Sequence, residues 1–367
     1  MPRSVETLRL GLERNGHGAY VFAPRVPGFS DPSTQIFRGP SVPALTYPDF
    51  YVPLPVWPGL SSTVRNLSLD LFHAHHPFLL GQAARRLASR FRRPLIFTYH
   101  TKYDAYAHYV PFLQVVVRRF AINLSTAFSN QADLVIAPSH SIATRLSFLG
   151  VTSRIEVVPT GVDLKQFAPG DREAARRQLG LPGDALILLT VGRLDKEKSV
   201  EFLLKVFDAV GSLSSESYLV LVGQGKAERP LKALASKLPV GARVLFVGAM
   251  PSGKVAEYHR ASDLFLFASQ TETQGLAVAE AQASGLPVVA VRASGVEEVI
   301  RDGETGLLLP AEVKQFAGAT HQLLFDTSRR RRIGELAREA ISKQFTAEQS
   351  VARHVELYSE VIKKLDC

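Results

Sequence analysis

The sequence predicts an α/β protein with two doubly wound domains, and three observations support this prediction. Short runs rich in Val, Leu, Ile and Phe recur without polar residues at alternate positions, as in strands buried on both faces of a parallel sheet. Helical patterns separate these runs along the whole chain. The chain has 367 residues, which is more than one hydrophobic core usually accommodates.

The expected elements alternate in order along the chain. Strands are expected at residues 19–23, 69–74, 94–98, 134–137, 155–158, 186–191, 218–222, 244–247, 264–268 and 288–291. Helices are expected at residues 4–15, 81–89, 199–212, 229–237, 274–284 and 329–365. Pro and Gly interrupt the pattern at residues 159–170, which predicts a domain boundary there. The predicted parts are residues 1–160, residues 161–340, and a C-terminal helix at residues 341–367 that packs back toward the first domain.

The first half begins with a helix, although a Rossmann-like half normally begins with a strand that lies in the middle of its sheet. Without that strand, two neighbouring strands lose a ladder partner. Either the natural chain starts upstream of Met1, or this half is reorganised.

The composition is that of an ordinary globular protein, with 46% hydrophobic and 21% charged residues, which excludes disordered and collagen-like classes. The single cysteine, Cys367, cannot form a disulfide within the chain, which fits a reducing compartment. No signal-peptide pattern is found, and no uncharged apolar stretch approaches the roughly 20 residues that span a bilayer. We expect a cytoplasmic protein or one on a membrane surface.

Positive charge is concentrated between residues 61 and 150, where ten Arg or Lys residues face three Asp residues, out of a net charge of +9 for the chain. A solvated basic face is one explanation, and attraction to an anionic membrane is the favoured one. Nucleic acid is the least favoured partner because aromatic residues do not interleave with the arginines.

The segment VGRLDKEKS follows the strand expected at residues 186–191, so Gly192, Arg193 and Lys198 come after its carboxyl end. Strands of open α/β sheets face the ligand crevice at that end. Two cations beside the start of the next helix can clamp a diphosphate. A solvated loop with two ordinary basic residues is the alternative.

The segment FASQTETQGLAVAEA places Glu272 on a turn and Glu280 on the helix that follows. Their spacing of eight residues is slightly over two helical turns, so both carboxylates can point to one side. The N–H groups of Thr273 to Leu276 are expected at a helix N-terminus, where a phosphate is stabilised. Two solvated glutamates are the alternative, although the small and apolar flanking residues disfavour it.

Two histidine-rich segments, HAHHP at residues 73–77 and TYHTKYDAYAHY at residues 98–109, each follow an expected strand. They lack the spacing of a zinc site. Metal binding, contact with a sugar hydroxyl or backbone carbonyl, and a purely structural role all stay open for these imidazoles, and a structural role is the default for any single one.

Taken together, these segments resemble the family-four glycosyltransferases of the GT-B fold, in which two Rossmann-like domains face each other across a cleft. The resemblance is carried by VVPTGVD, VGRLDKEK, LVGQG, DGETGLLL and the two glutamates of the Glu–seven residues–Glu motif. The strings HAHHPFLLG, TYHTKYDAYAHYVP and SQTETQGL look most like bacterial diacylglycerol glucosyltransferases. Phosphatidylinositol mannosyltransferases and sulfoquinovosyl transferases look similar.

The resemblance implies a retaining transferase that moves a hexose, with UDP-glucose as the expected donor, and that requires no cofactor or metal. Arg193 and Lys198 are expected to neutralise the leaving diphosphate, and Glu280 to hold the ribose hydroxyls. Glu272 is expected to contact the sugar. His100 is expected at the reacting face.

The family also implies that the donor-binding set includes residues that offer backbone groups, namely Gly192, Gln274, Gly275 and Leu276. The implied acceptor is a lipid such as 1,2-diacylglycerol, taken by a peripheral protein from the inner face of the cell membrane. Candidate acceptor and membrane contacts are Tyr103, His108, Arg85, Arg86, Arg118 and Arg119.

Relatives have a first strand and a Gly-rich loop before the helix that residues 4–15 resemble, and this chain has neither. An inactive GT-B protein that binds membranes or partners is therefore the alternative from another functional class.

Overall fold

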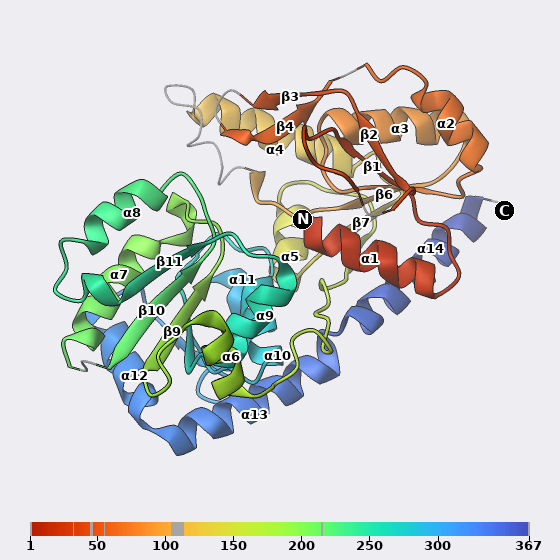
Figure 1. Ribbon diagram of the computed structural model, residues 1–367. Coiled ribbons are helices and arrows are strands. Elements are labelled where there is room, and N and C mark those ends of the chain that lie inside the picture. Colours follow the sequence, from red (N-terminus) through yellow and green to blue (C-terminus); the bar gives the residue numbers. More distant parts are fainter. Residues whose placement is uncertain are drawn as a thin grey trace. The chain divides into compact units, whose positions relative to one another are not determined.

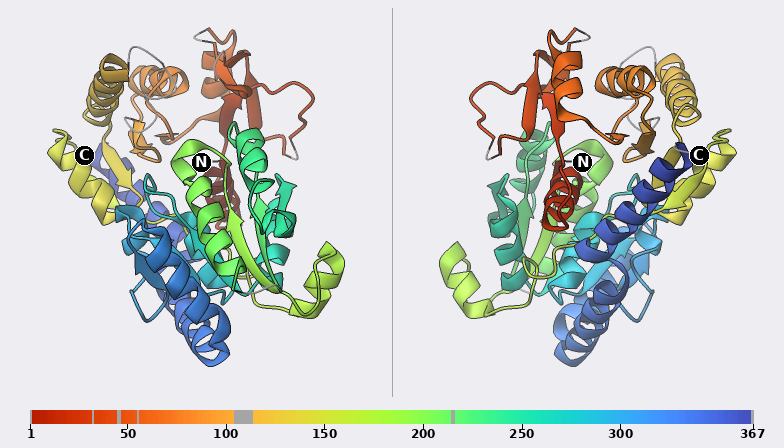
Figure 2. Two further views of the ribbon diagram at one scale, coloured as in Figure 1. Left: turned by 90° about the vertical axis from the view of Figure 1, so that its left-hand side faces the viewer. Right: turned by 90° about the vertical axis from the view of Figure 1, so that its right-hand side faces the viewer.

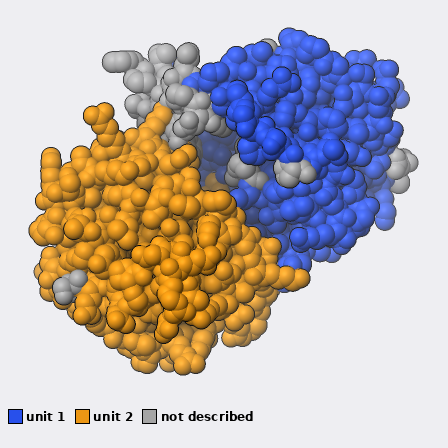
Figure 3. All heavy atoms as spheres, viewed as in Figure 1, with its two compact units in different colours: residues 1–161, 347–367 blue, residues 162–346 orange. Residues whose placement is uncertain are grey.

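The computed structural model describes residues 2–31, 33–44, 47–54, 56–103, 114–213 and 216–365 (Figure 1). The chain forms two compact units, shown in different colours in Figure 3. Unit 1 contains Met1–Gly161 and Ala347–Cys367, and unit 2 contains Val162–Thr346. The C-terminal segment therefore belongs to the same unit as the first half of the chain. No helix in the described ranges is long and apolar enough to cross a membrane.

Unit 2 is built on one parallel sheet with the strand order β11-β10-β9-β12-β13-β14. The first strand of the unit, β9, lies in the middle, and the order reverses between β9 and β12. This is the Rossmann arrangement, whose ligands bind beyond the carboxyl ends of the strands at the reversal. The strands are β9 (Leu186–Val191), β10 (Ser217–Val222), β11 (Val244–Gly248), β12 (Leu264–Phe267), β13 (Val288–Val291) and β14 (Leu307–Leu309).

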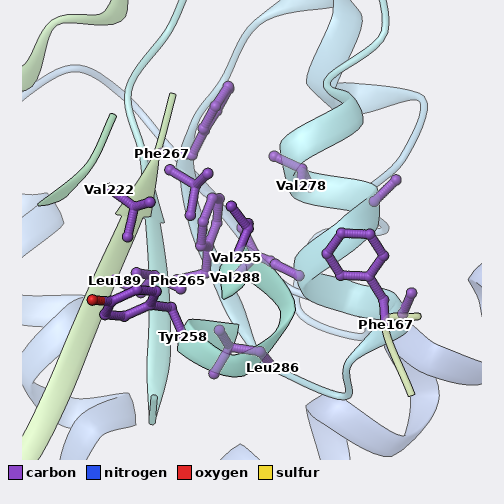
Figure 4. Close-up of a cluster of buried hydrophobic side chains, with 14 of the residues drawn as sticks. Phe167, Leu189, Val222, Val255, Tyr258, Phe265, Phe267, Val278, Leu286 and Val288 are labelled. Carbon is purple, nitrogen blue, oxygen red and sulfur yellow. The ribbon is translucent and has the colours of Figure 1, made fainter. Parts of the chain in front are cut away.

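Both faces of this sheet are buried. Leu189, Phe265 and Val288 point into one cluster of buried side chains (Figure 4). Their strand neighbours Leu188 and Leu266 point into a second cluster. Since successive strand residues face opposite sides, the sheet is the middle layer between two layers of helices (Figure 2).

The helices of unit 2 alternate with its strands, as the sequence pattern predicts. They are α6 (Arg172–Leu179), η2 (Lys196–Lys198), α7 (Val200–Gly211), α8 (Glu228–Ala235), η3 (Gly241–Arg243), α9 (Ser252–Ala261), α10 (Leu276–Ala283), α11 (Ser294–Glu297), α12 (Val313–Phe325) and α13 (Thr327–Gln344). Asp171 and Asp326 cap α6 and α13 with their carboxylates, which each accept a backbone N–H of the first turn.

The strands of unit 1 fall into separate sheets. The four-stranded parallel sheet has the order β5-β6-β7-β8, β1 pairs in parallel with β2, and β3 with β4 forms an antiparallel pair. Among the described residues, β1 and β5 each have one paired neighbour. The strands are β1 (Val21–Pro24), β2 (Ile36–Gly39), β3 (Ser41–Ala44), β4 (Tyr47–Pro53), β5 (Phe72–Ala74), β6 (Leu95–Thr98), β7 (Leu134–Ala137) and β8 (Ile155–Val157).

Helices cover both faces of the β5–β8 sheet. One face packs into a cluster that includes Ala88, Phe128 and Ile142, from three successive helices. The other face packs against Leu357 and Val361 near the C-terminus. The helices of unit 1 are α1 (Pro2–Arg14), α2 (Leu60–Leu67), α3 (Leu79–Phe91), α4 (Gln114–Ser129), α5 (His140–Phe148) and α14 (Ala347–Leu365).

The predicted strands are found close to their expected positions, and those at 134–137, 186–191 and 288–291 match to the residue. The short strands β2, β3, β4 and β14 were not predicted. The helical stretch expected at residues 329–365 is two helices, and the boundary expected after residue 340 falls inside α13. The helix ends at Gln344 because the next residues pair elsewhere. Phe345 accepts the N–H of Val162, and Thr346 forms a β-bridge with Val162.

A buried charged cluster ties the start of β12 to two helices of unit 2. The fully buried Asp263 carboxylate accepts Nη2 of the buried Arg176 at 2.8 Å and the N–H of Ile187 at 2.8 Å. Arg172 approaches its second oxygen at 2.7 Å, and Arg330 lies 3.9 Å from it. The carboxylate is therefore stabilised only while these cations and the backbone of β9 surround it.

Replacing Asp263 with Asn should lower the free energy of unfolding by about 3–5 kcal/mol, because Arg176 loses its counter-ion while it stays buried. Urea unfolding followed by circular dichroism measures the change. The control is Glu173→Gln, which removes an exposed ion pair with Arg177 and should cost less than about 1 kcal/mol. If both variants lost the same free energy of unfolding, burial of the Asp263 ion pairs would not explain their contribution to stability.

Candidate functional site

The carboxyl ends of β9 and β12 bring two predicted motifs of unit 2 together. Gly192 and Arg193 follow β9, and Glu272 follows β12, which pairs directly with β9. Lys198, the last residue of η2, forms an ion pair with Glu272 across the reversal of strand order. The two residues are far apart in the sequence, so their contact depends on the pairing of β9 with β12.

Arg193 is held by two carboxylates of its own segment. Its Nη1 lies 2.6 Å from Asp195 Oδ2, and its Nη2 lies 2.6 Å from Glu197 Oε1. The Arg193 side chain is 45% exposed, whereas those of Asp195 and Glu197 are 1% and 3% exposed. Both cations of the expected clamp therefore contact carboxylates, which the sequence prediction did not anticipate.

Glu280 lies on α10 and is buried, whereas Glu272 precedes the helix. The spacing of eight residues therefore does not place the two carboxylates on one helix face, which corrects the geometric basis of that prediction. Helix α10 begins only at Leu276 because its N-cap, Gly275, has a left-handed backbone with φ of 80°, a conformation that glycine adopts without strain. Gln274 is buried beside this turn.

The turn that carries Glu272 packs tightly against the start of α11. A Cβ atom added to Gly295 would lie 2.4 Å from the carbonyl oxygen of Glu272 and 3.0 Å from the nitrogen of Gln274. Only glycine fits at that distance, so a side chain here would move the turn. Gly295 therefore supports the position of Glu272, although no sequence motif singled it out.

Unit 1 gathers four imidazoles at the ends of β5 and β6. His75 Nδ1 lies 2.9 Å from His100 Nε2, and their rings stack with centroids 5.1 Å apart. His73 lies between Tyr358 Oη at 2.6 Å and Thr98 Oγ1 at 2.7 Å. The fourth ring, His354, is buried on α14.

Burial lowers the pKa of His73 and of His100 well below the ordinary value, and the neighbouring imidazoles lower both further. Burial likewise lowers the pKa of His75 and of His354. Because His354 Nδ1 contacts the carbonyl oxygen of Ser350 at 2.7 Å, that nitrogen carries the proton of the neutral ring. The cluster is therefore neutral near pH 7.

A small pocket of about 20 Å³ opens beside these rings, which is room for about one water molecule. Ser4 and Thr7 of α1 line it together with His75, His100 and Ser350. The structure thus surrounds the predicted site residue His100 with hydroxyl and imidazole groups. Among the described residues, no group of His, Cys, Asp and Glu is arranged to hold a metal ion.

The candidate acceptor contacts lie in different environments. Tyr103 packs against Phe78 and Tyr99 with ring centroids 5.2 and 5.3 Å apart, so it belongs to the aromatic packing of unit 1. Burial raises the pKa of its hydroxyl well above the ordinary value. His108 lies outside the described residues. The four candidate arginines lie on α3 and α4, where Arg85 is half-buried and Arg86, Arg118 and Arg119 are exposed.

Sequence reasoning missed several of these partners. Asp195 and Glu197 stand two and four positions after Arg193, a spacing that hinted at contact within one turn. His354 and Tyr358 are four residues apart on one helix, but the contact of Tyr358 with His73 of β5 joins residues 285 positions apart, which no local pattern reveals.

Comparisons with known proteins cover both halves of the chain. Residues 1–166 match the family described as Glycosyltransferase Family 4, and residues 171–340 match Glycosyl transferases group 1. The chain is 31% identical over 332 residues to the alpha-monoglucosyldiacylglycerol synthase of Streptococcus pneumoniae. That alignment covers 88% of this chain and 75% of that protein.

Two solved structures show the same fold. The sucrose-phosphate synthase of Thermosynechococcus elongatus superimposes with a TM-score of 0.81 at 26% identity, over 98% of this chain and 93% of that chain. The HepE protein of Anabaena, solved in complex with UDP-glucose, superimposes with a TM-score of 0.71 at 24% identity, over 82% and 81% of the two chains.

Acidification should destabilise unit 1 through the histidine cluster. The folded-state pKa values lie below those of the unfolded chain, so the unfolded chain binds more protons as the pH falls below about 6.5. Stability is therefore retained above that pH and decreases below it, by about 1.4 kcal/mol per pH unit for each extra proton bound.

His354→Asn should reduce the decrease in Tm between pH 7.5 and pH 5.5, because the amide can still donate to Ser350 but does not titrate. Scanning calorimetry at both pH values measures the two Tm values. The control is His17→Asn, at an exposed position, which should keep the wild-type pH dependence. An unchanged decrease in His354→Asn would exclude His354 from the effect.

Proposed function

The chain belongs to the family-four glycosyltransferases of the GT-B fold, and from that membership we propose that it transfers glucose from UDP-glucose to a lipid acceptor such as 1,2-diacylglycerol, with retention of anomeric configuration. The likeness to a monoglucosyldiacylglycerol synthase supports the acceptor and the sugar. The fold shared with a protein solved with UDP-glucose is consistent with the donor.

One observation carries the donor side of this proposal: Lys198 meets Glu272 at the reversal of strand order between β9 and β12. In Rossmann-like sheets this is where a nucleotide lies. In the proposal, Lys198 and Arg193 stabilise the charge that develops on the leaving diphosphate. They supply the charge stabilisation that a bound cation supplies elsewhere, so the proposal needs no metal or other cofactor.

The remaining predicted residues receive roles around the sugar and the ribose. Glu280, buried on α10, accepts hydrogen bonds from the ribose hydroxyls. Glu272 contacts the sugar beside the backbone N–H groups at Gln274 and Gly275. His100, whose ring contacts His75, keeps the proposed role of contacting the transferred sugar. Catalysis then rests on positioning and charge stabilisation.

A donor-by-acceptor screen tests the function directly. The protein is incubated with UDP-glucose, UDP-galactose or GDP-mannose and with vesicles that contain diacylglycerol or phosphatidylinositol. Product masses are then measured. A monohexosyl-diacylglycerol from UDP-glucose is the expected product. Hexosyl transfer to another lipid, or no transfer with UDP still bound, would overturn the assignment of acceptor or activity respectively.

Glu280→Ala should weaken UDP binding about 10- to 100-fold, since hydrogen bonds of ribose hydroxyls to a buried carboxylate are lost. Titration calorimetry measures the dissociation constant. Glu304→Ala removes an exposed carboxylate of the same unit and should leave it unchanged. Wild-type affinity in Glu280→Ala would remove the ribose role.

The acceptor side of the proposal rests on α3 and α4. Val115, Val116 and Phe120 of α4 are 80%, 64% and 63% exposed and lie among exposed arginines. Helices α3 and α4 contact each other, since a Cβ at Gly81 would lie 3.3 Å from the ring of Phe128. Exposed apolar side chains beside cations suit an anionic membrane interface. We therefore propose peripheral attachment to the inner face of the cell membrane.

Replacing Arg85, Arg86, Arg118 and Arg119 with Gln should strongly weaken binding to anionic vesicles, at about 1 kcal/mol for each arginine near the surface. Vesicle sedimentation measures binding as a function of lipid concentration. Binding to zwitterionic vesicles should change much less, because the attraction to anionic lipid is electrostatic.

The matched control removes the same charge from α13 of unit 2, by replacing the exposed residues Arg329, Arg331, Arg332 and Arg338 with Gln. This variant should bind vesicles nearly as the wild type does. If both variants lost the same vesicle binding, net charge alone would explain the attraction. If neither variant lost vesicle binding, α3 and α4 would be excluded as the membrane contact.

A further inference from the structure

The carboxylates around Arg193 present an electrostatic problem. Asp195 and Glu197 are almost fully buried, yet each contacts the half-exposed guanidinium of Arg193 at 2.6 Å. Glu272 contacts Lys198 nearby. Three carboxylates therefore surround the two cations assigned to the diphosphate. On charge alone, these carboxylates repel an incoming anion.

Both residues that contact Arg193 are anchored to other parts of unit 2, Asp195 through its carboxylate and Glu197 through its backbone. The second oxygen of Asp195, Oδ1, accepts the N–H of Lys226 at 3.0 Å, in the segment that follows β10. The carbonyl oxygen of Glu197 accepts a hydrogen bond from Ser269 Oγ at 3.3 Å, in the segment that follows β12. The Asp195 side chain and the Glu197 backbone are thus tied to the segments that follow the strands on either side of β9.

The guanidinium is planar and carries five N–H donors in a fixed arrangement. When each terminal nitrogen contacts a different buried carboxylate, both the position and the plane of the group are fixed. A long, half-exposed side chain otherwise loses rotamer freedom on binding a ligand, which weakens the binding. Fixing Arg193 in advance removes that loss.

We propose that Asp195 and Glu197 are positioning residues, which hold Arg193 in the orientation that receives the donor diphosphate. The inference rests on the proposed role of Arg193 in donor binding. If charge alone mattered, removing one of these negative charges would strengthen the binding of an anion. The proposal predicts the opposite, namely that the anion binds more weakly.

The test measures UDP binding by titration calorimetry in Asp195→Asn. The Asn oxygen can still accept the N–H of Lys226, but its amide group faces Nη1 of Arg193 and can no longer hold it. The dissociation constant should increase about tenfold. Glu197→Gln should act in the same direction. Tighter or unchanged binding in both variants would overturn the proposal.

A double-mutant cycle separates positioning from a general structural effect. In an Arg193→Ala background, Asp195→Asn should no longer weaken UDP binding, and the loss of a repelling charge can strengthen it. If Asp195 acts through the fold of the loop instead, the same tenfold loss will appear in both backgrounds and the proposal fails. Arg193→Ala alone tests the donor role: unchanged UDP affinity there would overturn the proposed function of Arg193 and not only its positioning.

The chain contains a matched control in the same unit. Asp302 Oδ1 accepts the N–H of Leu308 at 2.9 Å, and Asp302 Oδ2 accepts Nη2 of the half-exposed Arg292 at 2.6 Å. Asp195 bonds in the same way to the N–H of Lys226 and to Arg193. Asp302→Asn should change the UDP dissociation constant less than about twofold, because Arg292 has no assigned role in donor binding. A tenfold change there would show that any such substitution in unit 2 weakens UDP binding, and would remove the support for positioning.

Discussion

The pairing of β9 with β12 determines where the chemistry of unit 2 is located. These strands are neighbours although two others separate them in the sequence, and the strand order reverses between them. Their carboxyl ends bring Lys198 to Glu272 and place Arg193 at the same edge of the sheet. The buried side chains on both faces of the sheet hold the strands in register, so the residues at the strand ends are held on a rigid core.

Both cations at this edge have carboxylate partners before any donor arrives. Arg193 and Lys198 each contact carboxylates, and those of Asp195 and Glu197 are buried. An anion that binds here must share cations that already have partners. Such a site gains affinity from the fixed orientation of its cations more than from its net charge, because Arg193 and Lys198 need little rearrangement when the ligand binds.

Unit 1 uses neutral groups instead. Its imidazoles contact one another and hydroxyl groups, and burial keeps them uncharged near pH 7. The C-terminal helix α14 supplies two of the contacting side chains, so the end of the chain completes a site begun by β5 and β6. Positive charge and exposed apolar residues are found instead on the helices that cover the other sheet face.

The sequence by itself determined the α/β class, most strands, the family and the motifs around Arg193, Glu272 and Glu280, because buried strands and strand-end loops leave local patterns in composition. It did not determine that Gly295 packs against the turn of Glu272, that Asp195 and Glu197 hold Arg193, or that α14 supplies His354 to a histidine cluster. Those facts depend on side-chain direction and on contacts between distant segments. Only tertiary packing decides them, since local spacing is compatible with more than one arrangement.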